Sequence, residues 1–163
     1  MSFDLFHLAP SLNLDEALLR KTYLEIQKEN HPDFGSDLQL SEKANHFYKI
    51  LSKPLSRTAH LITEYHHFDL NINKLDNGFL MEMMEIGESI EASNSPENKI
   101  ELETQLNKYK QDFDVEFSEI KSEWGQTDIS EISPELWTKL ILWYQKQRYI
   151  ERLRKLLNDI SEI

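Results

Sequence analysis

The fold is decided by one continuous stretch, which reads NLDEALLRKTYLEIQKEN (residues 13–30), HPD (31–33) and FGSDLQLSEKANHFYKIL (34–51). In the first part, Leu19, Tyr23 and Ile26 recur at the spacing of one helix face, which predicts a buried stripe. Pro32 ends this helix, because proline disfavours helical geometry in the residue before it. The last part predicts a second amphipathic helix, so two helices are joined by a turn that contains His-Pro-Asp.

Capping and breaking residues mark the ends of these helices. Glu16 follows Asn13 by three residues, as in a capping box, so we expect the first helix to begin at Asn13 and to run to about Asn30. The second helix is expected over about residues 40–52 and ends before Pro54.

The rest of the chain also predicts helices and no sheet, which makes the fold class all-α. Only four glycines occur, long stretches lack any breaker, and alternating β-branched runs are absent. We expect further helices over about residues 4–8, 55–65, 78–92, 96–124 and 134 to the C-terminus. Residues 69–76 lack helical periodicity, so we expect them to connect an N-terminal domain to a C-terminal three-helix bundle.

Composition narrows the classes of function. The chain has 163 residues, 18 Lys and Arg, 29 Asp and Glu, a net charge of −11 and no cysteine. Without cysteine it has no disulfide, no zinc ribbon, no thiol nucleophile and no thiolate of its own for an iron–sulfur cluster. The acidic balance argues against nucleic acid as a partner. The N-terminus lacks a signal-peptide pattern and no apolar run could span a membrane, so we expect an intracellular protein with no membrane partner.

Motifs of the familiar enzyme classes are missing from the sequence. Four scattered glycines cannot form a phosphate-binding loop, and neither GxSxG nor HExxH occurs. His66, His67 and Asp69 could in principle hold a metal, but polar residues at a domain junction are the simpler interpretation. We therefore predict no metal, no cofactor and no catalytic residue.

The surroundings of His31-Pro32-Asp33 resemble the J-domain of the DnaJ family. The tripeptide alone recurs by chance, but here it follows the pattern Phe3-x-Leu-Phe-x-Leu8 and a helix of about sixteen residues. It also precedes a helix that carries Asn45 and Leu51.

The match extends along nearly the whole chain and is similar to the HscB family, the J-type co-chaperones of iron–sulfur cluster assembly. It includes LSKPLSRTAHL (51–61), HFDL (67–70) and FLME (79–82). The resemblance implies an L-shaped, all-α protein with a J-domain helical hairpin (1–68), a connector (69–76) and a three-helix scaffold-binding domain (77–163). It also implies a co-chaperone that delivers the iron–sulfur scaffold IscU to a DnaK-type chaperone, HscA, and stimulates the ATPase of that chaperone.

The resemblance implies a chaperone-binding site made of His31, Pro32, Asp33, Arg20, Lys21 and Lys28. Asp33 can accept charge-assisted hydrogen bonds from an arginine. Lys21 and Lys28 share a helix face that can meet an acidic partner, although ordinary solvation explains them equally well. Phe34 stands where many J-domains have lysine, so one basic contact is missing.

The helix predicted over residues 78–92 carries two apolar strips. On a helical wheel, one strip is Phe79, Met83, Ile86 and Ile90, which a bundle would bury. The other is Leu80, Met81 and Met84, with Glu85 and Glu88 beside it. The pattern alone leaves open whether this second strip is an exposed docking patch or is covered by the last helix. The resemblance favours docking and implies scaffold contacts by Leu80, Met81, Met84, Glu85, Glu88 and Tyr149. Ala92 stands where relatives can carry another acidic residue, so we expect a shorter acidic rim.

Two rival interpretations stay open. A general J-protein would bind a different client through the same bundle, and a metal-dependent hydrolase would use His31, Asp33, His66 and His67. Some eukaryotic members carry a cysteine-rich N-terminal segment that is missing here, which favours a bacterial, cytoplasmic protein over one in the mitochondrial matrix. We expect the basic residues of the last helix to form a solvated face; they are Lys146, Arg148, Arg152, Arg154 and Lys155.

Overall fold

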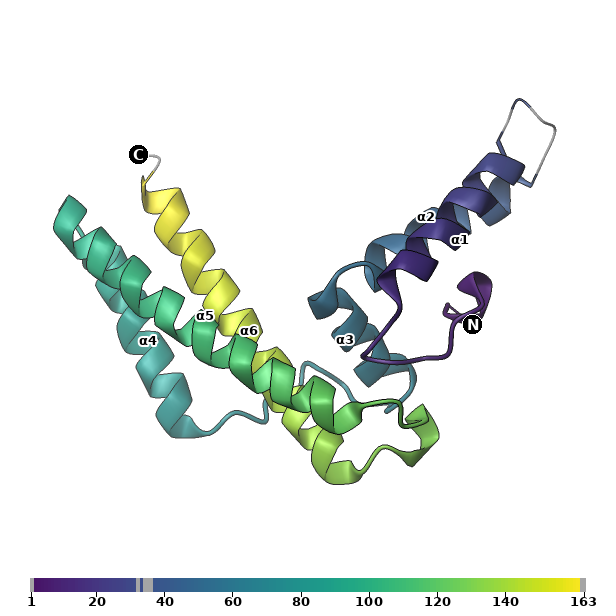
Figure 1. Cartoon of the computed structure of the whole chain (residues 1–163). Coiled ribbons are helices and arrows are strands. Elements are labelled where there is room, and N and C mark those ends of the chain that lie inside the picture. Colours follow the sequence, from purple (N-terminus) through teal and green to yellow (C-terminus); the bar gives the residue numbers. More distant parts are fainter. Residues whose placement is uncertain (1, 32, 34–36, 162–163) are drawn as a thin grey trace. The chain divides into compact units, whose positions relative to one another are not determined.

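The computed structural model describes residues 2–31, 33 and 37–161, and all the regular elements in these residues are helices. The elements are η1 (Asp4–Phe6), α1 (Glu16–Glu29), α2 (Leu38–Leu51), α3 (Pro54–Glu64), α4 (Asn77–Ala92), α5 (Pro96–Trp124), η3 (Ile129–Glu131) and α6 (Pro134–Ser161) (Figure 1). The predicted all-α class is confirmed. Within the described residues, no helix is both long and apolar enough to cross a membrane.

The chain divides into two compact units. The first unit contains residues 1–69 and 124–134, and the second contains residues 70–123 and 135–163. The segment 124–134, which follows α5, therefore packs with the N-terminal helices. Trp124 is fully buried, and the Asn13 side-chain amide donates a hydrogen bond to the Gly125 carbonyl oxygen at 3.0 Å.

In the first unit, α1 and α2 lie side by side as a helical hairpin, and α3 packs on α2 (Figure 1). The core of this unit is formed by Phe3, Phe6, Leu12, Leu19, Ala44, Leu51, Leu61 and Ile62. The predicted stripe on α1 is fully buried only at Leu19, whereas Tyr23 and Ile26 are half-buried. Tyr23 lies at the hairpin seam, where its ring stacks on Tyr48 with centroids 4.1 Å apart.

The predicted start of α1 is wrong. The N-cap residue is Asp15, whose side chain accepts a hydrogen bond from the Leu18 N–H at 3.0 Å. Aspartate caps a helix as well as asparagine does, and Asp15 lies closer to the apolar stripe. Asn13 lies before the helix, and its side-chain amide binds Gly125 instead. Glu16 is thus the first residue of α1 and not the third position of a capping box.

In the second unit, α4, α5 and α6 form the predicted three-helix bundle (Figure 1). The bounds predicted for α5, residues 96–124, are confirmed. On α6, the Trp143 ring stacks on Phe117 with centroids 4.0 Å apart, and its Nε1–H donates to the Phe113 carbonyl oxygen at 2.8 Å. Aromatic stacking and a satisfied indole N–H together fix the register of α5 against α6.

Candidate functional site

The turn between α1 and α2 presents two polar side chains to solvent. The side chains of His31 and Asp33 are 54% and 81% exposed, and Nδ1 of His31 lies 3.3 Å from Oδ2 of Asp33. The Asp33 backbone N–H also donates to Nδ1 of His31 at 3.3 Å, which requires the neutral imidazole. The imidazolium would donate Nδ1–H to the Asp33 carboxylate instead. Pro32 and Phe34, also named in the sequence analysis, lie outside the described residues.

Hydrogen bonds across the hairpin hold the helix ends that carry this turn. The Gln27 amide donates to the Ser41 carbonyl oxygen at 3.0 Å, and the Ser41 hydroxyl donates back to Oε1 of Gln27 at 2.7 Å. The Tyr23 hydroxyl donates to the Asn45 side chain at 2.5 Å. Since Gln27 and Ser41 belong to the turns of α1 and α2 nearest the loop, their pairing fixes where the chain leaves and re-enters the hairpin.

The three cations proposed for chaperone binding lie on the surface of α1. Arg20, Lys21 and Lys28 are all exposed. No carboxylate of the described residues pairs with any of them. They are therefore available to an acidic partner, while their role in binding stays a prediction.

A buried arginine that the sequence analysis did not single out joins α3 to α1. Arg57 is only 2% exposed, and its Nη2 lies 3.2 Å from Oε1 of Glu16. Its Nε and Nη1 have no hydrogen-bond partner among the described residues. Burying a guanidinium is costly, so Glu16 is needed to compensate its charge. In the sequence, Arg57 lies in the matched stretch 51–61, one helical turn before the buried Leu61, and nothing there indicated its ion pair.

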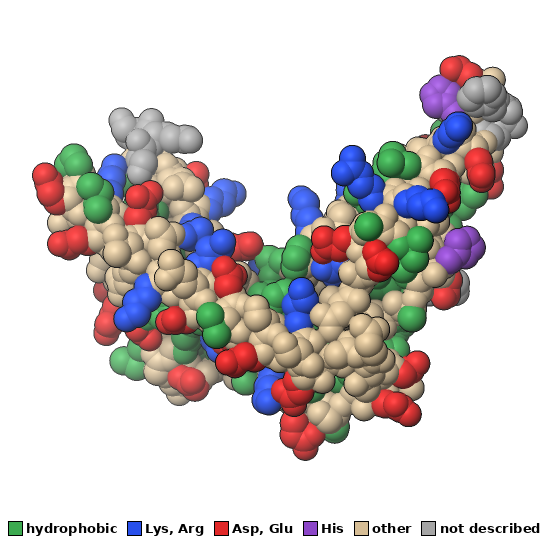
Figure 2. Space-filling view, in the orientation of Figure 1, with side chains coloured by type: hydrophobic (Ala, Val, Ile, Leu, Met, Phe, Trp, Pro, Cys, Tyr) green, Lys and Arg blue, Asp and Glu red, His purple; other side chains and the backbone are tan. Residues whose placement is uncertain are grey.

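The second surface lies on α4 and consists of Leu80, Met81, Met84, Glu85 and Glu88, here called the α4 patch. Met81 and Met84 are 62% and 65% exposed, and Leu80 is half-buried. Both glutamates are exposed, and Figure 2 shows acidic and hydrophobic side chains together at the surface over α4. For the two methionines, the alternative that the last helix covers this strip is wrong.

The opposite face of α4 is packed into the bundle, as the helical wheel predicted. Met83, Ile86 and Ile90 are buried, and Phe79 is half-buried. One helix face therefore anchors α4 and the other displays methionines, whose flexible side chains can adapt to a partner.

Tyr149 of α6 is brought next to the start of α4. Its ring packs edge-on against Phe79, with centroids 6.1 Å apart and an interplanar angle of 86°. The Arg152 guanidinium carbon lies 4.2 Å from the Tyr149 ring centroid. Because Phe79 directly precedes Leu80, the aromatic ring of α6 continues the surface that begins on α4.

The four residues of the hydrolase interpretation do not assemble. Among the described residues, which include His31, Asp33, His66 and His67, no group of three or more His, Asp or Glu could hold a metal ion. Burial lowers the pKa of His66, and the neighbouring His67 lowers it further.

Comparison with known proteins identifies relatives along the chain. A family model described as the HSCB C-terminal oligomerisation domain matches residues 75–158. A co-chaperone protein HscB homolog from Acinetobacter baylyi is 32% identical over 167 residues, which cover 98% of this chain and 88% of the relative.

Two solved structures share the fold. Chaperone HscB from Vibrio cholerae matches with a TM-score of 0.69 and 24% identity, over 99% of this chain and 97% of that chain. The human co-chaperone protein HscB matches with a TM-score of 0.74 and 23% identity, over 100% of this chain and 82% of that chain.

A helical hairpin with His31 and Asp33 at its turn, followed by a three-helix bundle, defines the class of J-type co-chaperones. Within this class, the family model and the Acinetobacter relative both indicate one family, HscB. The chain belongs to the HscB family.

Proposed function

We propose that this chain holds the iron–sulfur scaffold IscU on the α4 patch and brings it to a DnaK-type chaperone, HscA. The turn with His31 and Asp33 then stimulates ATP hydrolysis by that chaperone. The observation that carries the proposal is the exposure of Met81 and Met84 on a helix whose other face is packed through Met83, Ile86 and Ile90. Exposed methionines with glutamates beside them are typical of an adaptable docking site.

The two surfaces act by binding, and the chain itself catalyses no reaction. Its relatives are named as co-chaperones, which supports this reading. Asp33 is poised to accept hydrogen bonds from an arginine of the chaperone, since its contacts with His31 are long and solvent-exposed. Stimulation of hydrolysis then follows if the turn binds the hydrolysis-competent state of the chaperone better than its resting state. The bacterial origin of the Acinetobacter relative supports a place in the bacterial cytoplasm.

Single-turnover ATP hydrolysis by the cognate DnaK-type chaperone tests both surfaces. The native chain should stimulate hydrolysis, and the scaffold should increase the stimulation synergistically. Asp33→Asn should abolish most of the stimulation, because the amide no longer offers a charged acceptor. Glu29→Gln, an exposed carboxylate at the end of α1, is the matched control and should behave as the native chain does.

The outcomes separate the proposed function from its rival. Stimulation without synergy would leave a general J-domain co-chaperone with a different client. Ala92, which shortens the acidic rim, bears on the strength of scaffold binding and not on its existence. With a different client, Leu80→Ser with Met84→Ser would leave scaffold affinity unchanged. An absence of any stimulation would contradict the chaperone assignment.

A further inference from the structure

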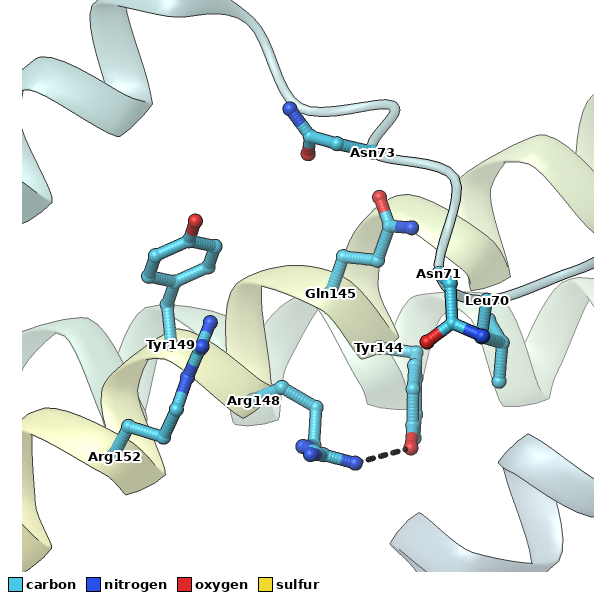
Figure 3. A pocket seen from close by; sticks show the side chains of 8 residues that line it. All are labelled: Leu70, Asn71, Asn73, Tyr144, Gln145, Arg148, Tyr149 and Arg152. Carbon is cyan, nitrogen blue, oxygen red and sulfur yellow. Dashed lines mark hydrogen bonds between the residues drawn. The ribbon is translucent and has the colours of Figure 1, made fainter.

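A polar pocket of about 290 Å³ lies between residues 70–73 and α6, within the second unit. Its walls include Asn71, Asn73, Gln145, Arg148, Tyr149 and Arg152, which come from the loop and from one face of α6 (Figure 3). Of these residues, only Tyr149 is expected from the resemblance to contact the scaffold, and the α4 patch includes none of them. The sequence analysis treated both arginines as part of a solvated face.

The wall formed by the loop is fixed in place. The buried Gln145 side chain donates to the Ile72 carbonyl oxygen at 2.7 Å and accepts from the Lys74 N–H at 2.9 Å. Because this side-chain amide both donates to and accepts from the backbone of the loop, it holds the loop against α6. The pocket is therefore formed before any ligand arrives.

Aromatic rings position the two guanidinium groups. The Arg152 guanidinium lies over the Tyr149 ring, 4.2 Å from its centroid. Nη1 of Arg148 donates to the Tyr144 hydroxyl at 3.0 Å, as the dashed line in Figure 3 marks. A ring contact orients a guanidinium without neutralising it, so its remaining N–H donors are free to bind an anion.

Neither arginine is paired with a carboxylate of the described residues, although the chain carries 29 acidic side chains against 18 basic ones. On the same helix, Lys139 pairs with Glu123 at 2.9 Å and Lys146 pairs with Glu116 at 2.7 Å. Two unpaired arginines in one pocket of an acidic protein are arranged for a carboxylate, which a guanidinium binds through two parallel hydrogen bonds.

We propose that this pocket binds an acidic side chain of the same protein that docks on the α4 patch, an inference that rests on the proposed function. We infer the occupant because the pocket and the α4 patch form one continuous surface. The Tyr149 ring lines the pocket and also packs on Phe79, next to Leu80 of the patch. The patch has an acidic rim at Glu85 and Glu88, whereas the pocket is basic. A partner with the complementary pattern of charge therefore docks in one orientation only.

Scaffold binding by variants of the full-length chain tests the proposal. Arg148→Gln with Arg152→Gln should weaken the affinity about tenfold, since two charge-assisted hydrogen-bond donors are lost. The affinity of this double variant should also depend less steeply on salt than that of the native chain. Lys155→Gln removes one charge from an exposed position of α6 outside the pocket and should change neither quantity. Arg152→Lys should recover only part of the loss of Arg152→Gln, because lysine cannot form the bidentate pair.

The outcomes distinguish this inference from the function on which it rests. Equal scaffold affinity for the native chain, the double variant and Lys155→Gln would overturn the inference and leave the proposed function intact. A native chain that does not bind the scaffold would overturn both. A double variant that alters only self-association in sedimentation would mean that a second copy fills the pocket, which also overturns the inference. Should the double variant unfold, Arg152→Gln alone decides, because within the described residues the Arg152 guanidinium is held by its contact with the Tyr149 ring and by no ion pair.

Discussion

His60, in the first unit, has a pKa that its surroundings lower. Its Nε2 lies 2.6 Å from the Ser2 hydroxyl, and its ring centroid is 6.2 Å from those of Phe3 and Phe47. Burial among these groups lowers the pKa of His60 from its ordinary value of 6.5, and this effect outweighs the carboxylate of Glu64, which raises it. The folded state therefore favours the neutral imidazole.

This shift makes the stability of the first unit sensitive to acid. Above about pH 6.5 the imidazole is neutral in both the folded and the unfolded state, so the full free energy of unfolding is retained. As the pH falls below that value, the unfolded state binds a proton first, and the free energy of unfolding falls until the folded-state pKa is passed. We expect urea unfolding across this range to show the decrease, and His60→Gln to flatten it.

The imidazole resonances of His60 provide the direct check. An imidazole that titrates at or above pH 6.5 in the folded protein would contradict the prediction, whatever the stability of the variant.

At the scale of single residues, the sequence predicts which residues share a helix face better than it predicts their partners. The two apolar faces of α4 could be predicted from periodicity, whereas the pattern left the exposure of Met81 and Met84 open and the structure shows it. The ion pair of Arg57 could not be predicted, because its partner Glu16 lies 41 positions earlier in the chain. The same holds for Gln145, whose backbone partners lie more than 70 positions away.

At the scale of elements, the start of α4 combines a helix cap and the first residue of the α4 patch in one turn. The Asp76 carboxylate accepts a hydrogen bond from the Phe79 N–H at 2.8 Å, immediately before Leu80 of the α4 patch. A Cβ at Gly78 would lie 3.1 Å from the same Asp76 oxygen, so a small residue suits that position. The cap thus fixes the first turn from which the patch extends.

Removing this cap should destabilise the first turn of α4. We expect Asp76→Ala to lower the free energy of unfolding by about 1 kcal/mol and Asp76→Asn to cost much less, since asparagine also caps helices. Hydrogen exchange of the backbone amides in the first turn should accelerate in the alanine variant. Asn77→Ala, at an exposed neighbouring position, is the control and should stay within about 0.5 kcal/mol of the native chain. Unchanged exchange in Asp76→Ala would show that the cap does not hold this turn.

Helix boundaries could be predicted where strong breakers mark them and not where several caps compete. Pro96 and Gly125 bracket α5, and both of its ends are confirmed. Asn13 and Asp15 are both good caps, and the choice between them depends on Gly125, whose carbonyl oxygen binds Asn13 from a distant part of the chain. No local pattern in the sequence indicates such a tertiary contact.

At the scale of the whole molecule, a chain that binds two partners, as proposed, would also control how often they meet. Joining the two binding surfaces covalently turns the second encounter into an intramolecular step at a raised effective concentration. A variant in which only one surface binds should then bind its own partner without bringing it to the other partner.

We therefore expect Asp33→Asn, added in excess over the scaffold, to inhibit the synergistic ATPase stimulation by the native chain. Adding Met81→Ser and Met84→Ser to the same chain should remove the inhibition, because the scaffold is then no longer sequestered. Steady-state ATP hydrolysis by the chaperone measures both effects. Inhibition that persists in the triple variant would mean that the scaffold is not the partner being withheld.

The assignment of residues 124–134 to the first unit has a consequence for how such chains can diverge. The backbone passes from one unit to the other at residues 69–70, 123–124 and 134–135. A single recombination event in the connector would therefore exchange α1–α3 without the segment that carries Gly125, the hydrogen-bond acceptor of Asn13. A descendant that replaces α1–α3 must therefore also replace residues 124–134 to keep this hydrogen bond, so one crossover cannot exchange the first compact unit for another.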